Sequence, residues 1–132
     1  MTKRSLAKSA VQLPTEAELE ILNILWAMGP STVRDVHTLS RKETGYTTVL
    51  KQMQVMAEKG LLVRSERYRS HVYAAKVEKT QTQRQLTRNL LERAFDGSAA
   101  GLVLGALSSQ PVSAEELREI RALLDEFEKK QM

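Results

Sequence analysis

Four polar side chains between positions 46 and 59 have types and a spacing suited to hydrogen bonding with a nucleic acid. They are Thr47, Thr48, Lys51 and Gln54. At about 100° per residue of an α-helix, they fall on one face. Their hydroxyl, ammonium and amide groups can bond to phosphate oxygens, and they can also reach base edges in a DNA groove. The pattern predicts a DNA-contacting face, although the same side chains on an arbitrary helix would be ordinary solvated surface.

The residues needed for catalysis, metal binding or cofactor binding are missing from the sequence. It has no cysteine, which excludes disulfides, thiolate metal sites and cysteine nucleophiles. Its two histidines, His37 and His71, come with no glycine-rich phosphate loop and no carboxylates clustered beside an apolar wall. We therefore expect no enzyme, no cofactor and no metal site. His37 is expected on a helix surface and His71 in a hairpin.

The helix predicted over residues 46–59 has an apolar side opposite the polar one. One arc of this helix collects Tyr46, Val49, Leu50, Met53, Met56 and Ala57. Such an arc is typical of a helix that packs its back on a core. Gly60 follows directly and predicts the end of the helix, because glycine readily takes the left-handed conformation of a C-cap.

Two further helices are predicted before this one, and each begins with a capping box. Thr15 and Glu18 have the required spacing, and so do Thr32 and Asp35. The first helix is expected to end at Gly29-Pro30, since glycine and proline both interrupt helices. The second helix is short.

Residues 61–75 predict a β-hairpin, because two short β-type runs flank a polar turn that carries arginine. The order helix, short helix, turn, helix, hairpin is that of a winged helix-turn-helix domain, here residues 14–76. The major groove of DNA admits one α-helix, whose N-terminal residues meet the base edges, and the hairpin (the wing) lies beside it. The predicted fold class is mainly α with a small β wing. The candidate DNA-contact residues are Thr32, Arg34, Arg41, Lys42, Tyr46, Thr47, Thr48, Lys51, Gln54, Arg67 and Arg69.

The net charge of +4 lies entirely in the N-terminal part of the chain. Residues 1–75 hold 11 Lys and Arg against 7 Asp and Glu, whereas residues 76–132 hold 9 of each. Residues 1–13 have no periodic apolar pattern and are predicted to be a flexible basic arm. The asymmetry indicates a polyanionic partner for the first part of the chain, although an excess of this size also fits ordinary surface chemistry.

Residues 77–132 are predicted to be a helical dimerisation domain of three helices. These helices are too short to enclose their own apolar stripes, and the stretch 99–107 is apolar nearly all round, so it must be buried from several sides. A second copy of the chain is the economical burial surface. The alternative is that the segment folds back on its own winged helix. The candidate dimerisation residues are Leu86, Leu90, Phe95, Leu102, Val103, Leu107, Leu117, Ile120 and Leu124.

Several short motifs in register resemble the penicillinase repressor (BlaI/MecI) family. These motifs are Leu13-Pro14-Thr15-Glu16-Ala17-Glu18-Leu19-Glu20-Ile21-Leu22 with Leu25-Trp26, Gly45-Tyr46-Thr47-Thr48-Val49, Glu58-Lys59-Gly60-Leu61-Leu62, Tyr73, Phe95-Asp96-Gly97-Ser98, Leu102-Val103, and Ser113 with Glu116-Leu117. No single motif is very specific, but together they span nearly the whole chain. The resemblance implies a homodimeric repressor that binds a palindromic operator in double-stranded DNA and whose C-terminal helices interlock with those of the partner.

The resemblance also implies a means of release. In the best-known members a membrane sensor metalloprotease detects β-lactam, and the repressor is cleaved within the dimerisation segment. The corresponding region here is Leu104, Gly105 and Ala106. The Asn-Phe pair that is cut in those members is absent, because Gly105-Ala106 stands in its place.

The predicted location is the cytoplasm, without membrane insertion. No apolar run approaches the roughly 18 residues of a membrane span, and the basic N-terminus lacks the apolar stretch of a signal peptide. The alternative function is a winged-helix protein-interaction module that does not bind DNA. A gel shift with a salt titration separates the two, since phosphate contacts make binding steeply salt-dependent.

Overall fold

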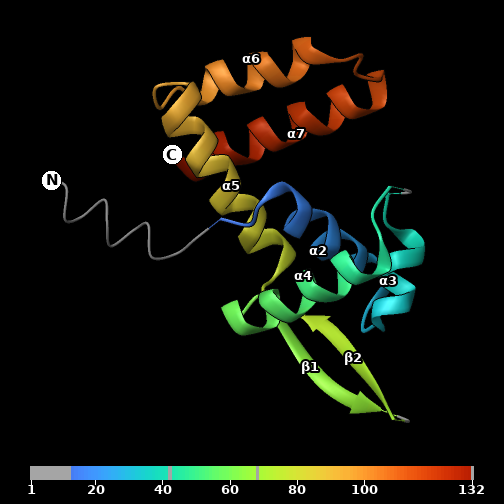
Figure 1. Cartoon of the computed structure of the whole chain (residues 1–132). Coiled ribbons are helices and arrows are strands. Elements are labelled where there is room, and N and C mark those ends of the chain that lie inside the picture. The colour runs from blue at the N-terminus through green and yellow to red at the C-terminus, as the bar shows by residue number, and fades with distance from the viewer. Residues whose placement is uncertain (1–12, 42, 68, 132) are drawn as a thin grey trace, which may run out of the picture. The chain divides into compact units, whose positions relative to one another are not determined.

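The computed structural model describes residues 13–41, 43–67 and 69–131, and it is mainly helical with one two-stranded antiparallel hairpin (Figure 1). The elements are α2 (Glu16–Met28), α3 (Val33–Leu39), α4 (Tyr46–Lys59), β1 (Leu62–Arg67), β2 (Ser70–Ala75), α5 (Lys79–Ala94), α6 (Ala99–Ser109) and α7 (Ala114–Gln131). This order confirms the predicted fold class. Apart from Leu13, the predicted basic arm lies outside the described residues, and so does Lys42.

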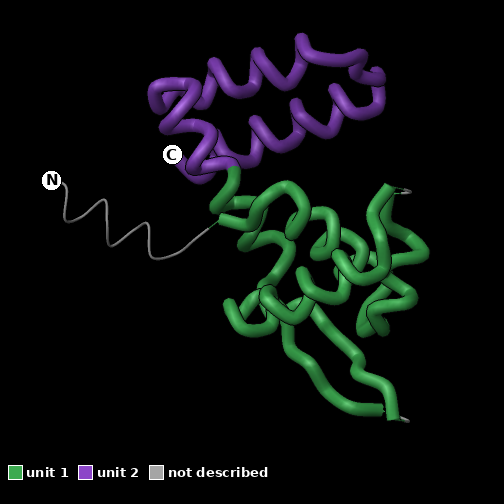
Figure 2. The backbone as a smooth tube through the Cα atoms, in the orientation of Figure 1, with its two compact units in different colours: residues 1–86 green, residues 87–132 purple. Residues whose placement is uncertain are grey.

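The chain divides into two compact units, residues 1–86 and 87–132 (Figure 2). The first unit contains α2, α3, α4, the hairpin and the first half of α5. The second unit contains the rest of α5 together with α6 and α7. The predicted boundary at residue 76 falls in the short connection that precedes α5.

Both predicted capping boxes are present at the N-termini of their helices. At the start of α2, Thr15 Oγ1 accepts a hydrogen bond from Glu18 N at 3.2 Å, and Glu18 Oε1 accepts one from Thr15 N at 2.9 Å. Thr32 and Asp35 make the same pair at the start of α3, at 3.1 and 3.3 Å. Backbone N–H groups that the first helical turn leaves unpaired are satisfied in this way.

Helix α4 begins and ends where the sequence predicts. Gly60 follows its last residue with a φ of 89° in the left-handed region. Its N–H donates to the carbonyl of Ala57 at 3.2 Å, and the next N–H, that of Leu61, donates to Met56 at 2.9 Å. These bonds satisfy carbonyl groups that would otherwise be unpaired at the helix end.

The hairpin is joined to the helices through Ser31, which pairs with strand β2. Ser31, just before α3, forms an isolated antiparallel bridge with Tyr73 of β2, with N–H to carbonyl distances of 2.9 and 2.8 Å. The strands themselves pair in register from Leu62 with Ala75 to Arg67 with Ser70. Figure 1 shows the far end of the hairpin extending away from α2, α3 and α4. The wing is thus fixed at its base and exposed at its tip.

The core of the first unit is formed by the apolar faces of α2, α3 and α4 and by the base of the hairpin. Its buried residues are Ile21, Leu22, Leu25, Val33, Val36, Val49, Met53, Met56, Leu62 and Tyr73. Tyr46, which the helical arc places with this group, is instead 45% exposed. As the first residue of α4 it lies past the edge of the core, so that prediction of burial was wrong.

The second unit has no comparable interior. Among the described residues of α6 and α7, none is buried. One close contact joins the end of α5 to α6, because the ring of Phe95 lies against the α6 backbone. A Cβ atom placed on Gly105 would lie only 3.3 Å from that ring. Gly105 therefore permits a close approach that a larger residue would crowd.

Candidate nucleic-acid interface

Helix α4 separates its two faces cleanly. Val49, Met53 and Met56 are buried in the core, with at most 1% of their surface exposed. The residues predicted to contact DNA on this helix are all exposed: Tyr46, Thr47, Thr48, Lys51 and Gln54. Helix α4 carries no acidic residue before Glu58. Its outward face near the N-terminus is thus uncharged or cationic, as a surface for a polyanion must be.

A hydrogen bond and a ring contact hold the turn that leads into α4. His37 Nε2 lies 2.9 Å from the carbonyl oxygen of Thr44, and the His37 ring meets the ring of Tyr46 edge-on, with centroids 5.8 Å apart. The expectation that His37 is an ordinary surface residue is incomplete, because it is half-buried and joins α3 to α4. The sequence offered no signal for this contact, which depends on how the turn folds.

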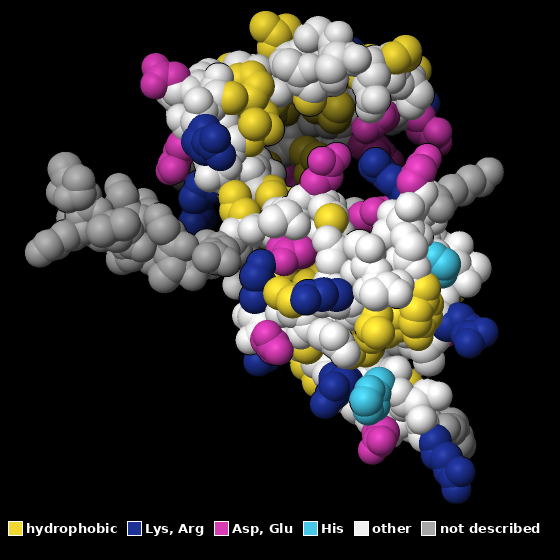
Figure 3. Space-filling view, viewed as in Figure 1, with side chains coloured by type: hydrophobic (Ala, Val, Ile, Leu, Met, Phe, Trp, Pro, Cys, Tyr) yellow, Lys and Arg dark blue, Asp and Glu magenta, His cyan; other side chains and the backbone are white. Residues whose placement is uncertain are grey.

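The wing presents arginine at its tip. Arg67 and Arg69 are both exposed, and Lys and Arg side chains lie at the far end of the hairpin in Figure 3. Arg69 has a φ of 66°, a left-handed conformation that a tight hairpin turn commonly requires. Nearer the helices, His71 of β2 lies opposite Glu66 of β1, with Nε2 and Oε2 3.8 Å apart.

The predicted contacts around α3 differ in how freely they can reach DNA. Thr32 is half-buried and its hydroxyl is engaged in the capping box, whereas the side chain of Arg34 is exposed. Arg41 is exposed but tied to α2, because its backbone N–H donates to Glu20 Oε2 at 3.1 Å and its Nε lies 3.8 Å from the same oxygen. Of these, Arg34 has the fewest local ties to break.

A partly buried ion pair joins the C-terminal end of α4 to the start of α2. Lys59 Nζ lies 2.7 Å from Glu18 Oε2, and Glu18 is only 6% exposed. Burial by itself raises the pKa of Glu18, but the hydrogen bonds from Lys59 and Thr15 and the charge of Lys59 outweigh it and leave the pKa below its ordinary value. The carboxylate is therefore ionised at neutral pH and helps to fix the direction of α4.

The predicted dimerisation residues are exposed or half-buried. In the second unit, the half-buried ones are Phe95, Leu102, Leu107 and Ile120, and the exposed ones are Leu90, Val103, Leu117 and Leu124. Leu86 is half-buried and belongs to the first unit. The predicted cleavage region lies inside α6, where Leu104 is 67% exposed, Ala106 is exposed and Gly105 lies against Phe95.

Residues 13–41, 43–67 and 69–131 contain no group of three or more His, Cys, Asp or Glu side chains placed to hold a metal ion. In the same residues, none of the helices has both the length and the apolar character needed to cross a membrane.

The fold and the exposed face of α4 define the class as a winged helix-turn-helix protein. Residues 14–126 match the model of the penicillinase repressor family, and the chain belongs to that family. It is 25% identical over 114 residues to a penicillinase repressor of Bacillus licheniformis, which covers 85% of this chain and 89% of the relative.

Two regulatory relatives are similar over almost the same span. The methicillin resistance regulatory protein MecI of Staphylococcus aureus (strain N315) is 21% identical over 113 residues, covering 84% of this chain and 92% of its own. The protein of the same name from Staphylococcus epidermidis matches to the same extent. Because the family is that of the penicillinase repressor and the relatives are a repressor and regulatory proteins, the role of this chain is transcriptional repression and it is not an enzyme.

Proposed function

We propose that the protein is a dimeric, sequence-specific repressor that acts in the cytoplasm and binds a palindromic operator in double-stranded DNA through α4 and the wing. The observation that carries this proposal is the exposed face of α4. Thr47, Thr48 and Lys51 project from its first two turns, while the opposite side of the helix is anchored in the core. A helix held in this way can enter the major groove without disturbing the fold.

The role of Thr47 and Thr48 can be tested by placing acids on this face. We expect the double variant Thr47→Glu, Thr48→Glu to lose binding to duplex DNA from the protein's own promoter region, because two carboxylates would face phosphates and base edges. Both positions are exposed, so the fold should survive. The measurement is a gel shift with a salt titration, supported by circular dichroism.

The matched control is Thr80→Glu, Gln81→Glu, which changes the net charge equally at two exposed positions in the first turn of α5. Acids are favourable at a helix N-terminus, so this variant should fold and bind as the wild type does. If the Thr47, Thr48 double variant kept full affinity, α4 would not be the recognition helix. Absence of any shift by the wild-type protein at low salt would favour the protein-interaction module.

Support for the dimer comes from the second unit. Leu117, Leu124 and Phe127 of α7 and Leu104 of α6 are all exposed, and apolar side chains of this unit are visible at the surface in Figure 3. Isolated exposed apolar residues are normal, but a unit without an interior is not. A second copy would cover these side chains. Its two-fold symmetry would set two α4 helices on half-sites about one helical turn apart, or a multiple of that.

Release of the repressor is the finer part of the proposal. Cutting the chain at Leu104, Gly105 or Ala106 would divide α6 and so destroy the surface that we assign to the dimer. A membrane sensor metalloprotease is the proposed agent. The test is mass spectrometry of the protein from cells in which repression has been lifted. A fragment ending between residues 104 and 106 would support cleavage, and an intact chain would contradict it.

A further inference from the structure

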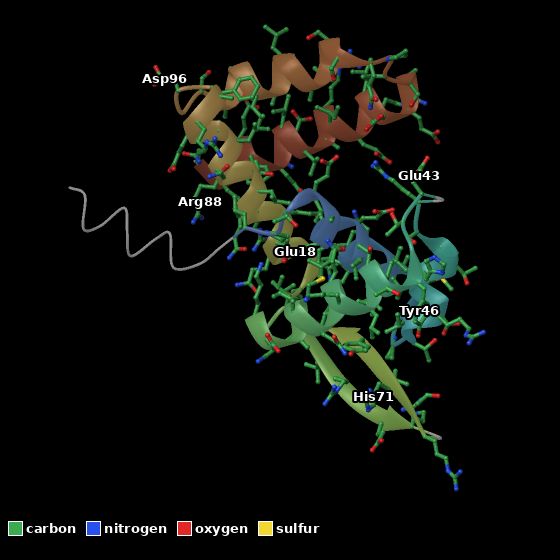
Figure 4. All side chains as sticks on the ribbon, in the orientation of Figure 1. Glu18, Glu43, Tyr46, His71, Arg88 and Asp96 are labelled. Atoms are coloured by element: carbon green, nitrogen blue, oxygen red, sulfur yellow. The ribbon has the colours of Figure 1, made fainter. Side chains whose placement is uncertain are left out.

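A hollow in the first unit opens between the starts of α3 and α4 and strand β2. Its volume is about 420 Å³. The buried residues Val33 and Tyr73 form part of its lining. The lining also includes four residues with polar ends, Arg34, Tyr46, Ser70 and His71. These four come from three different elements. Figure 4 shows Tyr46 at the start of α4 and His71 on the hairpin.

The polar groups at this hollow suit an anion. Arg34 supplies a guanidinium group, His71 an imidazole, and Ser70 and Tyr46 hydroxyl donors. None of the described residues that line it is Asp or Glu. A second hollow, of about 600 Å³ between α4 and β1, is different because the carboxylate of Glu58 lines it together with Arg64 and Gln54. Of these two hollows, the first offers cationic and hydroxyl donors with no Asp or Glu among its described lining residues.

We propose that Arg34, Tyr46, Ser70 and His71 form one binding site (the phosphate site) for a single backbone phosphate of the bound duplex. In this proposal, His71 contributes a positive charge to the phosphate site when it is protonated. The proposal rests on the proposed function, since it needs the duplex to approach α4. It goes beyond that function in joining α3, α4 and the wing at one phosphate, and in making the strength of DNA binding depend on pH through a single side chain.

The side chains around His71 carry charges of both signs. Glu66 lies opposite it on β1, 3.8 Å away, and Arg64 is the next charged residue along the same face of that strand. Arg34 faces the hollow from α3, and Tyr46 faces it from α4. An imidazolium between the Glu66 carboxylate and a phosphate would have an anion on each side. Histidine is the side chain whose charge ordinarily changes between about pH 5 and 8.

The experiment measures binding of the full chain to a synthetic mixed-sequence duplex long enough for two half-sites. Fluorescence anisotropy gives Kd across a salt series at about pH 6 and about pH 8. Each phosphate neutralised adds about one to the slope of log Kd against log salt concentration. Because Arg34 and His71 share one phosphate, a charge gained by His71 should strengthen binding without changing the salt slope. We expect the wild-type Kd at a fixed salt concentration to be several-fold lower at the lower pH, and this difference to disappear in His71→Gln. Arg34→Gln should lower the slope by about one at the higher pH.

Two control variants separate the effect of the phosphate site from the effect of net charge. Arg118→Gln removes one charge from an exposed position on α7, and Arg64→Gln removes one from the neighbouring hollow. Both should keep the wild-type difference between the two pH values. If His71→Gln also kept the difference between the two pH values, the proposed phosphate site would be wrong. Loss of binding by the Thr47→Glu, Thr48→Glu variant would then show that the proposed function still stood. A wild-type protein that bound no duplex at any salt concentration would overturn both.

Discussion

Glu18 contacts two helices at once, and its ionisation is linked to folding. One carboxylate oxygen closes the cap of α2 on Thr15, and the other accepts from Lys59 at the end of α4. Its pKa is lowered in the folded protein because Lys59 and Thr15 outweigh the effect of burial. A lowered folded-state pKa contributes stability that is present above the ordinary value of 4.5 and is lost as the pH falls through the folded value.

This gives a prediction for Glu18→Gln. The amide keeps most of the cap but loses the ion pair, so the free energy of unfolding at neutral pH should fall by about 1–2 kcal/mol. Urea denaturation as a function of pH is the measurement. The wild type should lose stability as the pH drops below about 4.5, and the variant should lose less over that range. Parallel pH profiles would mean that Glu18 is not a source of the linkage.

A second prediction at the residue scale concerns Lys51. If its ammonium group meets a phosphate, Lys51→Ala should weaken operator binding and lower the salt slope by about one. If it meets a base, the variant should instead relax sequence preference at one position. Lys79→Ala is the control, because Lys79 is an exposed cation in the first turn of α5. Equal binding by both variants would remove Lys51 from the interface.

At the scale of elements, the features that could be predicted from the sequence are local. The caps at Thr15 and Thr32 and the end of α4 at Gly60 depend on residues a few positions apart, so spacing alone reveals them. The features that could not be predicted join distant segments, such as the bridge of Ser31 to Tyr73 and the ion pair of Lys59 with Glu18. Such pairs exist only after the helices have packed.

The glycines that flank α4 give a prediction with an internal control. Gly60 has a φ of 89°, whereas Gly45 has a φ of −78°, and a Cβ atom would meet nothing within 4 Å at either position. Gly60→Ala should therefore cost about 1–2 kcal/mol from backbone conformation alone. Gly45→Ala should change stability by less than about 1 kcal/mol, because Ala is a poorer N-cap than Gly but lowers the entropy of the unfolded chain. Thermal denaturation measures both, and equal losses would contradict the assigned backbone geometry.

At the scale of the whole molecule, the two units differ in charge and in exposed apolar surface. The positive excess of the chain lies within residues 1–75, while the second unit carries exposed apolar helices. Pattern alone predicted where the apolar residues of α6 and α7 fall. It could not show that these helices lack an interior, because burial depends on how the helices pack. We therefore propose that a second copy completes this unit.

The proposed dimer predicts the behaviour of Leu124→Glu. Leu124 is 58% exposed on α7, so a carboxylate would be tolerated in a monomer and rejected at an apolar interface. Sedimentation analysis should show a wild-type dimer and a variant monomer, and operator affinity should fall because two linked half-site contacts become independent. Gln131→Glu makes the same charge change at the exposed end of α7 and should remain dimeric. A monomeric wild type would contradict the proposal.

We propose that the outward face of α4 lies in duplex DNA, and NMR of the isotope-labelled protein can test this placement residue by residue. Spectra would be compared before and after addition of operator duplex. We predict that the largest changes occur at Thr47, Thr48, Lys51 and Gln54, with smaller ones along the wing. Changes confined to α6 and α7, with these four residues unaffected, would show that α4 does not bind the duplex.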